Sequence, residues 1–189
     1  MKRIIYLGTI AIAAILGSCE NKNQGVNQEQ AEQDTVSYDV LAPYSERFRT
    51  IYKVDTGVFR GINFGMTVEE VQSMEGKTPM DTTEDTYLSY LFPLNELEEA
   101  EAGYYYGEDK RINKIQLNIY SSGLESQTQL FAEIKRYYIS KFGKPAIEED
   151  REVVWDLSGY NIFLRKLGNR KVQDIQVDFL KDRERPESV

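Results

Sequence analysis

The stretch that decides the fold runs over residues 112–145 and reads INKIQLNIYSSGLESQTQLFAEIKRYYISKFGKP. Over residues 112–120 apolar and polar side chains alternate, which predicts a strand with one dry face and one wet face. Over residues 125–142 apolar side chains recur at helical spacing, and Gly143 and Pro145 end that helix. The stretch therefore predicts a half-buried strand followed by a long amphipathic helix.

A similar order of elements is found in both halves of the chain. A shorter helix is predicted where Thr67 and Glu70 form a capping-box pattern, and Gly76 and Pro79 end it. The predicted strands cover residues 87–92, 103–106 and 112–120 in the first half and 153–157, 160–167 and 172–180 in the second. Because an apolar sheet face needs a cover, we predict an α+β domain over residues 59–181, with two helices on one face of an antiparallel sheet of about six strands. The shared order also suggests a tandem αβββ repeat.

The start of the chain is typical of an export signal. Lys2 and Arg3 precede an apolar core over residues 4–16, which is shorter than the roughly 20 residues of a membrane-spanning helix. The four residues Leu-Gly-Ser-Cys that end at Cys19 resemble the lipobox of bacterial lipoproteins. The resemblance implies that residues 1–18 are a signal peptide and that Cys19 carries the lipid. An ordinary secretory signal next to an unmodified cysteine is the alternative.

Polar segments are expected on both sides of the domain. Residues 19–37 hold the cysteine and then a tether with too few apolar side chains to form a core. Residues 38–58 lead into the domain, and residues 182–189 are expected to be a disordered, charged tail.

The composition excludes several classes of function. The chain has 23 Lys and Arg, 31 Asp and Glu, no His and one Cys. Catalysis by Ser-His or Cys-His pairs and metal binding by imidazole are therefore excluded, and the acidic balance argues against nucleic acid as a partner. The spacings of phosphate-binding, dinucleotide-binding and calcium-binding loops are missing as well. The sequence predicts no catalytic residue, no metal site and no cofactor.

A short motif adds a family resemblance. Gly-Met-Thr at residues 65–67, followed by Val71, Gly76 and Pro79, resembles the helix entry of the SmpA/OmlA family of small outer-membrane-assembly lipoproteins. That family is similar in fold to the beta-lactamase inhibitor proteins, in which helices pack on one face of an antiparallel sheet, often as tandem αβββ units. The resemblance implies a lipoprotein of the bacterial cell envelope, held in the outer membrane where the organism has one. A helix entry is not a binding site, so the role in outer-membrane assembly is not transferred.

The wet side of the sheet supplies the candidate interaction face. Its predicted residues are Gln116, Asn118, Tyr120, Gln176 and Asp178. Tyrosine is enriched where proteins bind each other, although a merely solvated face is ordinary in antiparallel sheets. We predict a non-enzymatic protein, anchored to the membrane by its lipid, that binds another envelope macromolecule, such as a protein, through this face. The alternative is a carboxylate-based hydrolase or a small-ligand-binding envelope lipoprotein.

Overall fold

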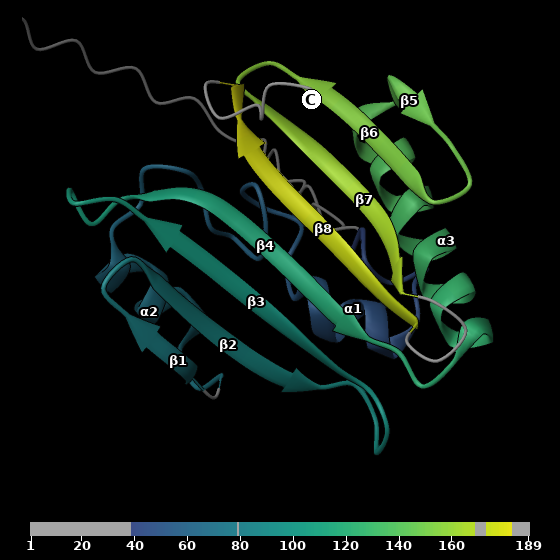
Figure 1. The fold of residues 1–189 in the computed structure, drawn as a ribbon, viewed down its shortest axis with the longest axis horizontal. Helices are drawn as coiled ribbons and strands as arrows, with labels where there is room; N and C mark the ends of the chain where they lie inside the picture. The colour runs from purple at the N-terminus through teal and green to yellow at the C-terminus, as the bar shows by residue number, and fades with distance from the viewer. Residues whose placement is uncertain (1–38, 79, 169–172, 183–189) are drawn as a thin grey trace, which may run out of the picture. The chain divides into compact units, whose positions relative to one another are not determined.

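The computed structural model describes residues 39–78, 80–168 and 173–182 (Figure 1). Its helices are α1 (Glu46–Tyr52), α2 (Val68–Glu75) and α3 (Leu124–Phe142). Its strands are β1 (Met80–Glu84), β2 (Tyr87–Pro93), β3 (Glu99–Tyr106), β4 (Ile112–Tyr120), β5 (Ile147–Glu148), β6 (Glu152–Leu157), β7 (Tyr160–Gly168) and β8 (Gln173–Lys181). The predicted signal peptide, Cys19, the predicted tether, Pro79 and residues 183–189 of the predicted tail lie outside the described residues.

All eight strands form one antiparallel sheet in the order β1-β2-β3-β4-β8-β7-β6-β5. The two halves join at the centre, where β4 pairs with β8 and Leu117 lies opposite Val177. In each half one helix, α2 or α3, comes before four consecutive strands. The predicted α+β class and antiparallel sheet are confirmed, but the sheet has eight strands where about six were expected.

The two additional strands lie at the edges of the sheet. β1 reads MDTTE and β5 has only two residues, so neither shows the alternation that marks a half-buried strand. β1 and β5 are strands because their backbones hydrogen-bond to β2 and β6. A strand at the edge of a sheet can form in this way without an apolar face of its own. Edge strands of this kind leave no periodic signal in the sequence.

The third helix, α1, lies within residues 38–58, the segment predicted to lead into the domain. The hydroxyl of Ser45 accepts a hydrogen bond from the backbone N–H of Phe48 and so caps the helix. Phe48, Ile51 and Tyr52 are buried and belong to the same core as the sheet. The domain therefore has three helices where two were predicted.

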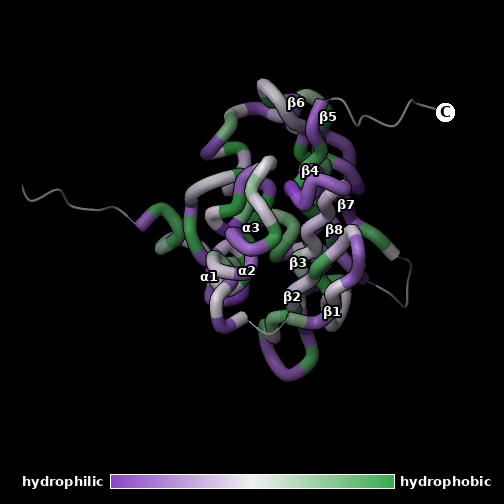
Figure 2. Tube along the Cα trace, turned by 90° about the vertical axis from the view of Figure 1, so that its left-hand side faces the viewer, coloured by the Kyte–Doolittle hydropathy of each residue, from purple (hydrophilic) through white to green (hydrophobic). Residues whose placement is uncertain are grey.

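The three helices lie on the same side of the sheet (Figure 2). Val71 on α2 and Ile134 on α3 are both fully buried, in agreement with the predicted packing of both helices on one face of the sheet. Aromatic rings fill much of the space between the layers, and the hydroxyl of Tyr52 donates to that of Tyr138 at 3.0 Å. The opposite side of the sheet carries no helix in the part of the chain that the structure describes. No described helix is long and apolar enough to cross a membrane.

A buried ion pair fastens α2 to the rest of the domain. Both oxygens of Glu75 accept hydrogen bonds from the guanidinium of Arg60, at 2.8 and 2.7 Å. The same carboxylate accepts from the hydroxyl of Tyr104 on β3 at 2.5 Å, and Arg60 also donates to the carbonyls of Thr50 and Ile51 on α1. This group of contacts joins α1, α2 and the sheet. The guanidinium of Arg60 and the carboxylate of Glu75 are buried, and each has the other as a hydrogen-bonded partner of opposite charge.

Candidate interaction face

The pairing of β4 with β8 brings the predicted face residues together. Gln116 lies opposite Asp178, and Asn118 lies opposite Gln176. The amide of Gln116 donates to Asp178 Oδ1 at 2.7 Å. Tyr120, at the end of β4, is 40% exposed. All five residues therefore lie on the side of the sheet that faces away from the helices, which we call the open face.

Asp178 differs from the solvated residue that the alternation predicted, because it is only 5% exposed. Arg165 Nη1 donates to Asp178 Oδ2 at 2.8 Å, and Lys114 Nζ lies 3.8 Å from Oδ1. Arg165 also donates to Glu152 at 2.6 Å. Long side chains from β4 and β7 thus surround this carboxylate, so Asp178 holds the face together and is not available for docking.

A second carboxylate, Glu101 on β3, organises the other half of the open face. It accepts hydrogen bonds from the hydroxyl of Tyr87 at 2.6 Å and from that of Tyr120 at 3.2 Å, and more weakly from the amide of Asn118 at 3.4 Å. Burial by itself would raise the pKa of Glu101, but these hydrogen bonds outweigh it and hold the pKa below its ordinary value. Glu101 is therefore a carboxylate in its charged form at neutral pH.

Tyr120 responds to the same charges in the opposite direction. Burial and then the negative charge of Glu101 raise the pKa of Tyr120 to about 12, with smaller contributions from Asp174 and Glu99. Its hydroxyl therefore stays protonated and can act as a donor. At this end of β4 the exposed ring of Tyr120 therefore lies near three carboxylates, those of Glu99, Glu101 and Asp174.

Two further tyrosines line the open face beside Glu101. Tyr87 and Tyr105 lie opposite each other on β2 and β3, with ring centroids 4.6 Å apart. The ring of Tyr87 crosses Gly103, where a Cβ atom would lie 2.7 Å from Tyr87 Cε2. Only glycine leaves room for this ring, because any side chain at that position would displace it.

The open face also holds four residues that were not predicted for it: Tyr87, Glu101, Gly103 and Tyr105. The predicted strand over residues 103–106 began too late, since β3 starts at Glu99 and its first half alternates Glu with Ala. A glycine within a strand was the available signal, because it often marks a close approach of another group.

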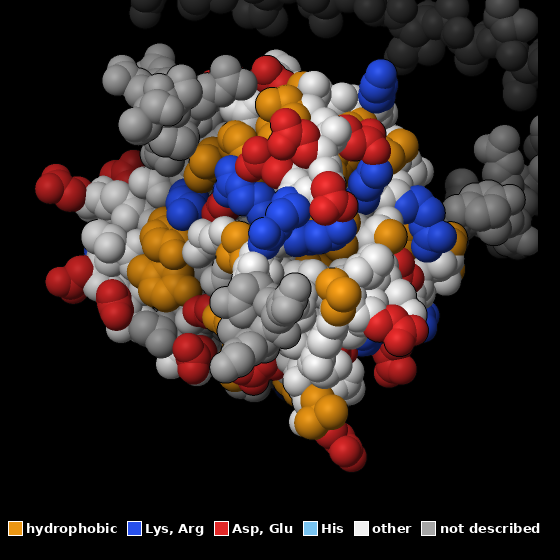
Figure 3. All heavy atoms as spheres, turned by 45° about the vertical axis from the view of Figure 1, so that its right-hand side comes forward, with side chains coloured by type: hydrophobic (Ala, Val, Ile, Leu, Met, Phe, Trp, Pro, Cys, Tyr) orange, Lys and Arg blue, Asp and Glu red, His pale blue; other side chains and the backbone are white. Residues whose placement is uncertain are grey.

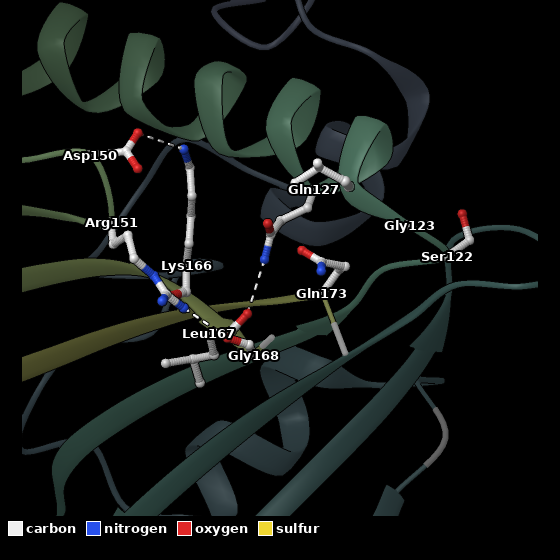
Figure 4. Close-up of a pocket in the computed structure, with 10 residues that line it drawn as sticks. Ser122, Gly123, Gln127, Asp150, Arg151, Lys166, Leu167, Gly168 and Gln173 are labelled. Carbon is white, nitrogen blue, oxygen red and sulfur yellow. Dashed lines mark hydrogen bonds and ion pairs between the residues drawn. The ribbon is translucent and has the colours of Figure 1, made fainter. Parts of the chain in front are cut away.

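Open hollows lie at the end of the sheet where β7 meets β8. One of about 540 Å3 is lined by residues from the start of α3 and the ends of β7 and β8 (Figure 4). Arg151 reaches the carbonyl of Gly168 at 2.9 Å, Gln127 donates to that of Leu167 at 3.1 Å, and Lys166 lies 3.6 Å from Asp150. Arg151 and Gln127 therefore bond backbone carbonyls, and Lys166 lies near the one carboxylate that lines this hollow, Asp150.

Carboxylates elsewhere give limited support to the hydrolase alternative. A second hollow, of about 410 Å3, is lined by Glu96, Glu98 and Glu99. Glu98 is held there by Arg47, Asn95 and two serines, so it has a structural partner set of its own. Among the described residues, no group of three or more His, Cys, Asp or Glu side chains is arranged to hold a metal ion.

No family model, curated protein or solved structure matches the chain. The function therefore has to be inferred from the residues of the open face and from the start of the sequence.

Proposed function

We propose that this protein is a non-enzymatic lipoprotein of the bacterial cell envelope that binds another envelope macromolecule through the open face. The observation that carries the proposal is the hydrogen-bonded group of Tyr87, Glu101 and Tyr120, which presents partly exposed rings in fixed positions. Rigid aromatic side chains with a polar end are suited to interfaces, because little conformational entropy is lost when they are covered. The helices cover the other side of the sheet, so this side is the one that a partner can reach.

The lipid anchor is proposed on the sequence alone. Lys2, Arg3, the apolar core over residues 4–16 and the lipobox-like residues before Cys19 support it. With residues 20–37 as a tether, the domain would be held close to the membrane surface, in the outer membrane where the organism has one. We expect Cys19→Ser to release the protein from the membrane fraction; equal membrane retention with normal signal processing would overturn the anchor.

The resemblance to the SmpA/OmlA family and the tandem repeat are part of the same proposal. Support for a repeat comes from chain order, since α2 precedes β1 to β4 and α3 precedes β5 to β8. The Gly-Met-Thr motif at residues 65–67 stands directly before α2, where Thr67 and Glu70 form both hydrogen bonds of a capping box. The motif thus has a folding role that two unrelated chains could share.

The binding function can be tested by photo-crosslinking in intact cells. A photo-reactive amino acid replaces Tyr120 in the full chain, and the matched control carries it at Ile139, an exposed position of similar accessibility on α3. We expect a discrete covalent adduct from position 120 that is absent from position 139. If neither position 120 nor position 118 gives an adduct beyond that control, the open face does not bind a partner and the proposal fails.

A further inference from the structure

The open face is acidic. The strand registers place seven carboxylates and two cations at outward positions of the described strands. The carboxylates are those of Glu84, Glu99, Glu101, Glu152, Asp156, Asp174 and Asp178, and the cations are Lys114 and Arg165. Figure 3 shows that many of the Lys and Arg side chains on the side turned to the viewer gather in one band, with acidic and hydrophobic side chains beside it. The positive charge is therefore unevenly distributed over the side that this view shows.

Both cations of the open face are already used within it. Arg165 pairs with Asp178 and Glu152, and Lys114 lies near Asp178. Across the described part of the chain, by contrast, no Lys or Arg forms an ion pair with Glu99, Glu101 or Asp174. The neighbours of Glu101 are neutral phenols and an amide. The negative charge around Tyr120 thus has no cation of the described domain to balance it.

Aromatic rings of the open face already receive cations. Lys114 Nζ lies 4.6 Å from the ring centroid of Tyr105, and the guanidinium of Arg165 lies 4.7 Å from that of Phe163. Such contacts stabilise a positive charge over the face of a ring. The open face therefore already holds its own cations in the way that it could hold those of a partner.

We propose that the partner docks a basic segment, rich in Lys or Arg, onto the half of the open face around Glu101 and Tyr120. The inference rests on the proposed function and names the chemistry of the partner. A cationic side chain there would pair with Glu101 and lie against the ring of Tyr87, while Glu99 and Asp174 add attraction at longer range. The same charges would repel an anionic membrane surface or a nucleic acid.

The test measures binding of a labelled octalysine peptide to the full chain by fluorescence anisotropy, with octaglutamate as the reversed-charge probe. Glu101→Gln removes one charge from the face, and Glu149→Gln removes one from the exposed loop after β5 as a matched control. We expect Glu101→Gln to weaken octalysine binding about tenfold, against less than about twofold for the control. Binding should fall as salt rises, and octaglutamate should not bind.

Folding defects are separated from binding defects by a second variant. Glu99 is exposed, so Glu99→Gln should leave the unfolding midpoint unchanged and still weaken octalysine binding more than Glu149→Gln does. If Glu101→Gln, Glu99→Gln and the control Glu149→Gln all weaken octalysine binding equally, binding depends only on the net charge of the protein. That result would overturn the inference.

The inference and the proposed function can fail separately. If the adduct from position 120 forms in equal yield with and without Glu101→Gln, and at low and high salt, the open face binds a partner but not through a basic segment. If position 120 gives no adduct at all, the proposed function fails and the inference fails with it. An adduct whose yield falls with Glu101→Gln but not with Glu149→Gln supports both.

Discussion

Replacing Glu98 by Gln should destabilise the domain by about 2 kcal/mol at neutral pH. Glu98 lies in the loop between β2 and β3 and is only 5% exposed. One oxygen accepts from the backbone N–H of Ser122 at 3.0 Å, from its hydroxyl at 2.8 Å and from the hydroxyl of Ser126. The other accepts from Arg47 at 2.9 Å and from Asn95 at 2.6 Å. This single carboxylate therefore joins α1, the loop and the start of α3.

The magnitude follows from the pKa of Glu98 and from its hydrogen bonds. Burial alone would raise the pKa, but the donors around it outweigh burial and lower it from 4.5 to about 2. Because a tenfold change in proton affinity is worth about 1.4 kcal/mol, that lowering corresponds to about 3 kcal/mol of stabilisation by the charged form. Glutamine keeps one acceptor oxygen, so part of this stabilisation remains, but its NH2 group faces other donors and cannot accept from them. The expected loss of stability is therefore about 2 kcal/mol.

The pH dependence has a definite sign. Since the pKa of Glu98 is lower in the folded state than in the unfolded chain, its stabilisation is complete above about pH 4.5 and is lost as the pH falls towards 2. A glutamine side chain does not titrate, so the difference between wild type and Glu98→Gln should shrink by about half or more between pH 7 and pH 3.

The assay is urea unfolding at both pH values, followed by the fluorescence of Trp155, the one tryptophan of the chain. Glu96→Gln is the control, because it removes the same charge from an exposed position in the same loop and should change stability by less than about 0.5 kcal/mol. Equal losses for the two variants would refute the reasoning. So would a Glu98→Gln loss that stays the same at pH 3.

Three further changes test other contacts of the domain by the same urea unfolding. Ile134→Ala should cost about 2 to 5 kcal/mol because the side chain is fully buried between α3 and the sheet, and a loss below about 0.5 kcal/mol would contradict that burial. Glu75→Gln should cost about 3 kcal/mol, since it leaves Arg60 as a buried charge without a counter-ion, and a variant as stable as wild type would show that the pair is dispensable. Gly103→Ala should cost about 1 kcal/mol by moving the ring of Tyr87 out of reach of Glu101, and it should also weaken octalysine binding; an unchanged affinity would show that the ring position does not matter.

Local patterns predicted the elements that have a strong period or a capping sequence of their own. The strand predicted over residues 112–120 is β4 (Ile112–Tyr120), and the helix predicted over residues 125–142 is α3 (Leu124–Phe142). The capping box of Thr67 and Glu70 forms as expected. Such signals lie within one element, where side chains three or four residues apart share a helix face and alternate side chains share a strand face.

Elements and sites that depend on distant neighbours were predicted less well. The polar strand β1 forms because β2 is beside it. The short helix α1 is a different case, because Phe48, Ile51 and Tyr52 recur at helical spacing behind the Ser45 cap, and this local signal was overlooked. Asp178 was placed on the correct side of the sheet but was expected to be solvated. Its burial comes from Arg165 and the other long side chains of neighbouring strands, and alternation along one strand carries no information about those.

By itself the sequence determined where the main strands and the long helix lie and which side of each strand is dry. The prediction of a lipid at Cys19 also rests on the sequence alone. Tertiary structure alone decided that β4 lies between β3 and β8, and hence that Glu101 meets Tyr87 and Tyr120 while Gln116 meets Asp178. The physical reason is that the period of a strand fixes the face to which a side chain points, whereas the order and register of the strands choose its neighbours on that face.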